Sequence, residues 1–145
     1  MVIAIFGESC TGKSTLADRL KDRLGATVYS GKDYLRFAKT EPEARAAFSK
    51  LLGEAQAPII LVAAEKEQLS LIPGNAVRVL ATADIALIKE RFAKRTGGVL
   101  PPPVAAMLER KHGAFDLEPH DVRFVSGGSD PEELCDRIMR LAASR

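Results

Sequence analysis

The chain has 145 residues, of which 46% are apolar and 28% charged, and its formal net charge is +2. This composition indicates a globular protein with one core, and it excludes a disordered or fibrous chain. Because the net charge is small and the basic residues are spread along the chain, no nucleic-acid partner is expected. No apolar stretch approaches the length of a membrane span, so no membrane partner is expected either.

Cysteine usage and the first residues indicate where the protein works. Cys10 and Cys135 are too few for a disulfide framework and fall in predicted elements far apart in the chain. No basic segment precedes the first apolar run, so nothing resembles a secretory signal. We therefore expect a cytoplasmic protein in a reducing environment.

The first predicted elements are a strand, a loop and a helix. The strand is the apolar run Val2–Phe6, and the helix is the pattern Thr15–Leu24. Between them, residues 7–14 read Gly-Glu-Ser-Cys-Thr-Gly-Lys-Ser, which matches every fixed position of the phosphate-binding pattern G-x-x-x-x-G-K-[ST]. A strand before this pattern and a helix after it are the setting in which it binds nucleotide phosphates.

Each fixed position of this loop has a physical role. Gly7 and Gly12 permit backbone angles that let successive N–H groups turn around a phosphate, and the helix directs its positive end to the same anion. Lys13 can reach the terminal phosphates, and the Ser14 hydroxyl can ligate Mg²⁺. The alternative is a glycine-rich anion loop that no longer holds a nucleotide. The residues predicted to contact the nucleotide are Gly7, Glu8, Ser9, Cys10, Thr11, Gly12, Lys13, Ser14 and Thr15.

Strand and helix patterns alternate along the rest of the chain with short connections. Further strands are predicted at 26–29, 58–64, 76–82 and 121–126, and further helices at 40–53, 65–71, 84–95, 104–111 and from 129 onward. Such alternation predicts an α/β fold with a five-stranded parallel sheet covered by helices on both faces. No linker divides the chain, so one domain over residues 1–145 is expected.

Residues 96–120 depart from this alternation. They begin with Thr-Gly-Gly, pass through three prolines, and carry Arg110 and Lys111 before Gly113. Glycine hinges around a proline-stiffened, cationic piece are typical of a mobile lid over a phosphate site. An ordinary surface excursion is the alternative.

These motifs together resemble the small P-loop kinases of the nucleoside-monophosphate-kinase and shikimate-kinase type over essentially the whole chain. The resemblance implies a P-loop NTPase fold of the small-kinase type with a lid segment, and ATP and Mg²⁺ as cofactors. In adenylate kinases, the helix entering the lid carries two arginines four residues apart, one on adenine and one on phosphate. Arg91 and Arg95 have that spacing here, and Gly127 and Gly128 occupy the place of the adenine-binding loop. A solvated helix flank is the alternative for the two arginines.

Two departures from the family concern the phosphoryl acceptor and the metal. The region between the second and third strands, residues 31–57, has room for about one helix, so the acceptor site is shortened. The family's aspartate after the third strand is replaced by Glu65. This carboxylate either holds a Mg²⁺-bound water or opens the short helix that follows it.

Asp33 is the other candidate carboxylate, because it follows the second strand at the edge of the sheet where ligands bind. It either orients the acceptor hydroxyl or forms a helix-capping pair with Ser30, three residues earlier. Lys32, Tyr34 and Arg36 could complete a pocket for a small anionic acceptor.

The function predicted from these features is an ATP-dependent, Mg²⁺-requiring kinase that phosphorylates a small acceptor, either a nucleotide or a small hydroxyl metabolite. Lys13 and Arg95 would stabilise the transferred charge, Ser14 and Glu65 would hold the metal, and Asp33 would contact the acceptor. The alternative function is a nucleotide-binding module or slow ATPase without kinase activity. The two differ in whether Asp33 and Glu65 both face the metal position beside Ser14.

Overall fold

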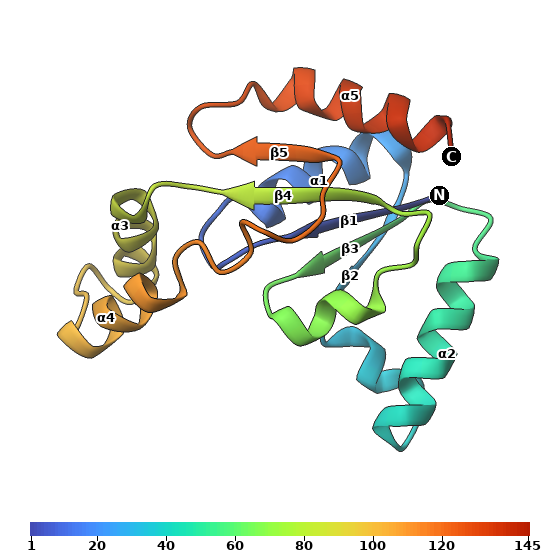
Figure 1. The fold of residues 1–145 in the computed structure, drawn as a ribbon, viewed down its shortest axis with the longest axis horizontal. Helices are drawn as coiled ribbons and strands as arrows, with labels where there is room; N and C mark the ends of the chain where they lie inside the picture. Colours follow the sequence, from blue (N-terminus) through green and yellow to red (C-terminus); the bar gives the residue numbers. More distant parts are fainter.

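The five predicted strands form one parallel sheet in the computed structural model, which describes residues 1–145 (Figure 1). The strand order is β2-β3-β1-β4-β5, so the first strand of the chain lies at the centre. The strands are β1 (Val2–Phe6), β2 (Thr27–Ser30), β3 (Ile59–Ala63), β4 (Val77–Thr82) and β5 (Val122–Val125). The predicted α/β class is therefore confirmed.

The helices lie within a few residues of their predicted bounds, except for η1, for which no bounds were predicted. They are α1 (Lys13–Leu24), η1 (Asp33–Phe37), α2 (Glu41–Glu54), η2 (Lys66–Leu71), α3 (Ile85–Arg95), α4 (Pro102–Lys111) and α5 (Pro131–Ala143), of which η1 and η2 are 3₁₀ helices. Thr40 caps α2, because its hydroxyl accepts the Glu43 N–H at 3.4 Å. None of the helices is both long and apolar enough to cross a membrane.

Helices cover both faces of the sheet and form two cores. Ile3 and Ile5 of β1 pack under α1 and α5 on one face, in a cluster that includes Ile138. The alternate residues of β1 point to the other face, where Phe6 belongs to a second cluster with Phe48 of α2. Since β1 is buried along its whole length, the loop that follows it rests on a rigid support.

The register of the sheet aligns the carboxyl ends of neighbouring strands. Phe6 pairs with Ala63, and Ser30 pairs with Val62. The connections after β1, β2 and β3 therefore all begin at the carboxyl-terminal end of the sheet, where ligands bind in open α/β folds.

Helices α3 and α4 extend beyond this edge (Figure 1). Ile88 of α3 and Leu108 of α4 share a small buried cluster with Cys10 from the loop after β1. An ion pair between Lys89 and Glu109 also joins the two helices. The segment predicted as a lid thus packs on α3 and contacts the loop.

Glycines with left-handed backbone angles flank α4. The φ angle is +85° at Gly97, +91° at Gly98 and +79° at Gly113. A residue with a side chain would be strained there, so these positions have the backbone freedom expected of hinges.

Candidate functional site

The loop between β1 and α1, residues 7–14, exposes a continuous series of backbone donors. None of the N–H groups of residues 8–15 bonds to a backbone carbonyl, whereas the N–H groups of Gly7 and Leu16 on either side do. Buried backbone donors in a folded protein are nearly always paired, and Cys10, Thr11 and Lys13 of this run are buried residues. A run of inward-turned N–H groups at a helix N-terminus forms a site for an anion such as phosphate.

Three residues hold the loop in this shape. A Cβ atom on Gly7 would lie 2.3 Å from the carbonyl oxygen of Ala81, so only glycine fits there. Gly12 is the N-cap of α1 with a φ of +85°. Cys10 has a φ of +64° although it is not glycine, and its buried side chain packs with the cluster between α3 and α4.

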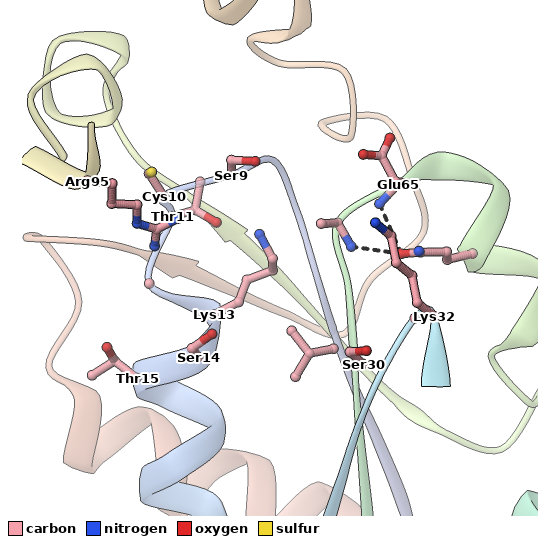
Figure 2. A pocket seen from close by; sticks show the side chains of 15 residues that line it. Ser9, Cys10, Thr11, Lys13, Ser14, Thr15, Ser30, Lys32, Glu65 and Arg95 are labelled. Atoms are coloured by element: carbon pink, nitrogen blue, oxygen red, sulfur yellow. Dashed lines mark hydrogen bonds between the residues drawn. The ribbon is translucent and has the colours of Figure 1, made fainter. Parts of the chain in front are cut away.

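Lys13 lies across this loop. Its Nζ atom donates to the Glu8 carbonyl at 2.5 Å, and the Thr11 hydroxyl donates to the same oxygen at 2.8 Å. Only 8% of Lys13 is exposed, and this burial lowers the pKa of its ammonium group to about 8. In Figure 2 the Lys13 side chain points into a cavity bounded by Ser9 and Ser30.

This main cavity has a volume of about 330 Å³ and lies between the loop and the ends of β2 and β3. Figure 2 shows Arg95 on one side, and Lys32 and Glu65 on the opposite side. Helix α2 contributes no residue to it. The lining residues are Ser9, Cys10, Thr11, Gly12, Lys13, Ser14, Thr15, Ser30, Gly31, Lys32, Val62, Ala64, Glu65, Gln68 and Arg95.

A second cavity of about 480 Å³ adjoins the first on the α3 side. Arg95 lines both cavities, whereas Arg91 lines only the second and donates to the Cys10 carbonyl at 2.9 Å. Gly127 of the loop after β5 lies on its far wall, but Gly128 faces a separate hollow on α5. The structure thus brings together Arg91 and Gly127, two of the three residues that the resemblance assigns to the nucleoside end.

The cations of both cavities have no acidic partners. Lys13, Lys32, Arg91 and Arg95 make no ion pair within 4.0 Å, although many surface cations do, such as Arg45 with Glu41 at 2.9 Å. Unbalanced positive charge in a cleft favours an anionic ligand.

Asp33 does not line the main cavity. Its carboxylate accepts the Ser30 N–H at 2.7 Å and contacts the Arg36 guanidinium at 3.0 Å. The Tyr34 hydroxyl likewise faces away and donates to Glu41 at 3.0 Å. Of the two interpretations of Asp33 drawn from the sequence, these contacts favour the capping one. Asp33 and Glu65 therefore do not both face the metal position beside Ser14, and the feature expected to distinguish a kinase from a binding module is met at most by Glu65.

Glu65 is the only acidic side chain that lines the main cavity, and its carboxylate has no ion-pair partner. Glu65 is the N-cap residue of η2 and forms a capping box with Gln68, whose side-chain oxygen accepts the Glu65 N–H at 3.2 Å. Glu65 therefore has the helix-opening role that the sequence offered as one of its two interpretations. The Ser14 hydroxyl lines the same cavity. A hydroxyl and a carboxylate oxygen are ligand types that suit Mg²⁺. Figure 2 shows Ser14 beside Lys13 on α1 and Glu65 on the opposite side of the cavity, so the two residues have the chemistry predicted for a metal site but do not lie together.

The loop is also joined to the lid by a contact that the sequence analysis missed. The Glu8 carboxylate lies 2.9 Å from Nδ1 of His112 and accepts the Gly113 N–H at 3.5 Å. Lys111 lines a small cavity of about 160 Å³ beside Glu8, whereas Arg110 lines none of the cavities described. The contact joins residues 104 positions apart, so no local sequence signal indicated it.

Comparisons with known proteins support the fold. No protein-family model matches the chain, and no curated protein matches it in sequence. Among solved structures, an uncharacterized protein from Eubacterium ventriosum has a TM-score of 0.70 at 19% identity, with 100% of this chain and 99% of that chain covered. A gluconokinase from Sinorhizobium meliloti has a TM-score of 0.62 at 17% identity, with 99% and 91% covered. Shikimate kinase from Acinetobacter baumannii, in complex with shikimate, has a TM-score of 0.63 at 15% identity, with 99% and 93% covered.

These similarities extend over nearly the whole of each chain, and two of the three proteins are small kinases. The chain therefore has the fold of small P-loop kinases, which agrees with the resemblance noted from its sequence.

Proposed function

We propose that the protein is an ATP-dependent, Mg²⁺-requiring kinase that transfers the γ-phosphoryl group to a small acceptor. The observation that carries the proposal is the run of unpaired N–H groups at residues 8–15, set among cations without acidic partners. A triphosphate supplies the acceptor oxygens and the negative charge that this arrangement lacks.

The two cavities suggest where the parts of ATP bind. The loop N–H groups and Lys13 hold the phosphates, and the second cavity receives the nucleoside between Arg91 and Gly127. Arg95 lines both cavities, so its guanidinium can stabilise the negative charge of the phosphoryl group during transfer. This division matches the family pattern of one arginine on the base and one on phosphate.

Transfer breaks the bond between the γ-phosphorus and the β-γ bridging oxygen, and forms a bond from the acceptor hydroxyl oxygen to that phosphorus. Because the transition state is loose, positioning and charge stabilisation matter more than a strong base. Lys13 and Arg95 stabilise the charge, and the Glu65 carboxylate receives the hydroxyl proton late in the transfer. Asp33 positions the turn that begins at Ser30.

Ser14 and Glu65 would also hold Mg²⁺, directly or through water. The ion supplies positive charge to the phosphate oxygens in this class of reaction.

The acceptor lies at the end of the main cavity formed by residues 30–32 and 64–68. Helix α2 does not widen this end, and the cavity of about 330 Å³ is shared with the phosphates. A small hydroxyl compound fits better than a nucleotide. The gluconokinase and the shikimate kinase among the similar structures are named for small acceptors of this kind.

The function is tested by following labelled γ-phosphate from Mg²⁺-ATP to a panel of small hydroxyl compounds and nucleoside monophosphates. We expect phosphorylation of a small hydroxyl compound, and ATP use that accelerates when this compound is present. ATP binding without any acceptor-stimulated turnover would instead support a nucleotide-binding module or slow ATPase.

The pKa of Lys13 leads to a prediction about pH. Burial of its ammonium group lowers this pKa to about 8, and a phosphate binds the protonated form. Below pH 8 the lysine is already charged, so ATP affinity is expected to change little with pH. Above pH 8 each binding event must first add a proton, so affinity falls about tenfold per pH unit.

Calorimetric titration of Mg²⁺-ATP from near neutrality to about two units above the Lys13 pKa measures this slope. Lys13→Met has no titrating group at this position and should bind weakly with no such slope. An equal slope in Lys13→Met and the parent protein would show that another group is responsible.

A further inference from the structure

The side-chain amide of Gln68 is held in one orientation at the acceptor end of the main cavity. Its Oε1 atom accepts the N–H groups of Ala64 at 3.1 Å and of Glu65 at 3.2 Å. If the amide were flipped, its NH₂ group would face these two N–H donors, so the hydrogen bonds determine which atom is the oxygen. The Nε2 atom consequently carries two N–H groups that have no acceptor in the protein. Only 9% of the residue is exposed, but no buried side-chain nitrogen lacks a partner, so Nε2 is the part of Gln68 that opens onto the cavity.

Gly31 keeps this amide in place. A Cβ atom on Gly31 would lie 2.2 Å from both Cδ and Oε1 of Gln68. The amide therefore packs directly against the backbone of Gly31, the first residue after β2. The Gly31 N–H donates to Val62 at 2.8 Å, which anchors that backbone to β3. Rotation of the amide away from the cavity is therefore blocked by the main chain.

Lys32 provides a charged donor beside this neutral one. It follows Gly31 directly, lines the same cavity, and has no carboxylate within 4.0 Å. Its neighbour Asp33 does not neutralise it, because that carboxylate contacts the Ser30 N–H and Arg36. In Figure 2 the Lys32 side chain extends along the cavity wall toward Glu65.

We propose that Gln68 and Lys32 together bind an oxyanion group of the phosphoryl acceptor, either a carboxylate or a phosphate monoester, and so determine acceptor specificity. The inference rests on the proposed kinase function and adds to it the chemical class of the acceptor. An amide fixed so that it offers only N–H donors to the cavity favours a ligand with an oxygen there. A ligand without that oxygen would displace water from the two donors and leave them unpaired. The ammonium group of Lys32 adds charge assistance to the same group.

Matched probes separate the neutral, carboxylate and phosphate forms of one carbon skeleton. Glycerol, glycerate and glycerol 3-phosphate form one set, and glucitol, gluconate and glucitol 6-phosphate form a second. Each is titrated into the protein saturated with Mg²⁺ and a non-hydrolysable ATP analogue. We expect an oxyanion form to bind about ten- to a hundredfold more tightly than its neutral partner, the usual range for a charge-assisted hydrogen bond.

Two variants test the residues separately. Gln68→Glu keeps an oxygen for Ala64 and Glu65 but replaces the donor by a second oxygen, so the oxyanion preference should be lost. Lys32→Gln removes only an exposed charge and should reduce the preference by about tenfold. Lys39→Gln is the matched control, because Lys39 is exposed and does not line the cavity. All three should bind the ATP analogue as the parent does.

The outcomes distinguish this inference from the function on which it rests. If the analogue binds but no probe set shows an oxyanion preference, the inference is wrong and the kinase proposal stands. If the preference exists but survives both Gln68→Glu and Lys32→Gln, other residues recognise the anion. If the parent protein does not bind the analogue, the proposed function itself fails. Should Gln68→Glu not fold, Lys32→Gln decides the matter, since an exposed lysine contributes little to stability.

Discussion

Replacing Lys13 by Ala is expected to lower phosphoryl transfer by about 10³-fold, the scale seen when one preorganised charge at a transferring phosphoryl group is lost. Lys13 is the only lysine within the loop, and Arg95 and Lys32 lie on opposite sides of the main cavity. Affinity for Mg²⁺-ATP should fall as well. The melting temperature should not drop, because the charged ammonium is held in a buried place that lowers its pKa to about 8.

The effect is measured as kcat/KM for acceptor-dependent ADP release, with calorimetry for ATP and thermal unfolding for the fold. Lys21→Ala is the control, since Lys21 is an exposed lysine in the last turn of the same helix. Equal ATP affinity and equal turnover in Lys13→Ala and the parent protein would show that this loop does not bind the nucleotide.

The second large effect is expected at Glu65. Glu65→Gln keeps the shape of the side chain but removes the only carboxylate that lines the main cavity. Transfer should fall by about 10²-fold or more, the range for loss of a group that accepts a proton or supports the metal. Asp33→Asn retains an oxygen for the Ser30 N–H, so it should lower transfer by much less.

The same pair of variants distinguishes the two interpretations of Asp33. If Asp33 only positions the turn, Asp33→Ala should cost about 1 kcal/mol of stability through the lost hydrogen bond, and activity should persist. Steady-state kinetics and thermal unfolding of all three variants provide the comparison. Asp33→Asn could instead lower the transfer rate as much as Glu65→Gln does, or more. In that case Asp33, and not Glu65, would be the carboxylate that orients the acceptor.

Features encoded over a few residues could be predicted from the sequence. Continuous apolar runs marked the strands, and the pattern at residues 7–14 identified the loop because its glycines and lysine act within one turn of chain. Thr40 marked the start of α2 for the same reason. The four-residue spacing of Arg91 and Arg95 predicted that they share one helix face, and both line the second cavity.

Features that depend on pairing between distant segments could not be predicted. The Gln68 amide faces the cavity because the register of β2 with β3 presses it against Gly31, and no local pattern reports that contact. Gly127 and Gly128 are adjacent in the chain, yet only one faces the second cavity. The bond of Glu8 to His112 depends on how α4 packs, which is a tertiary property.

The strand order has a consequence for how such a protein can change. The acceptor end is built from the connections after β2 and β3, and the nucleoside end from α3 and the connection after β5, with β1 and its loop between them. The two ends share few residues besides the loop and Arg95, so substitutions on one side of the sheet leave the other side in place. A lineage can therefore exchange the compound that it phosphorylates by altering Gly31, Lys32 and Gln68 while it inherits its phosphate donor unchanged, and a designer can follow the same route.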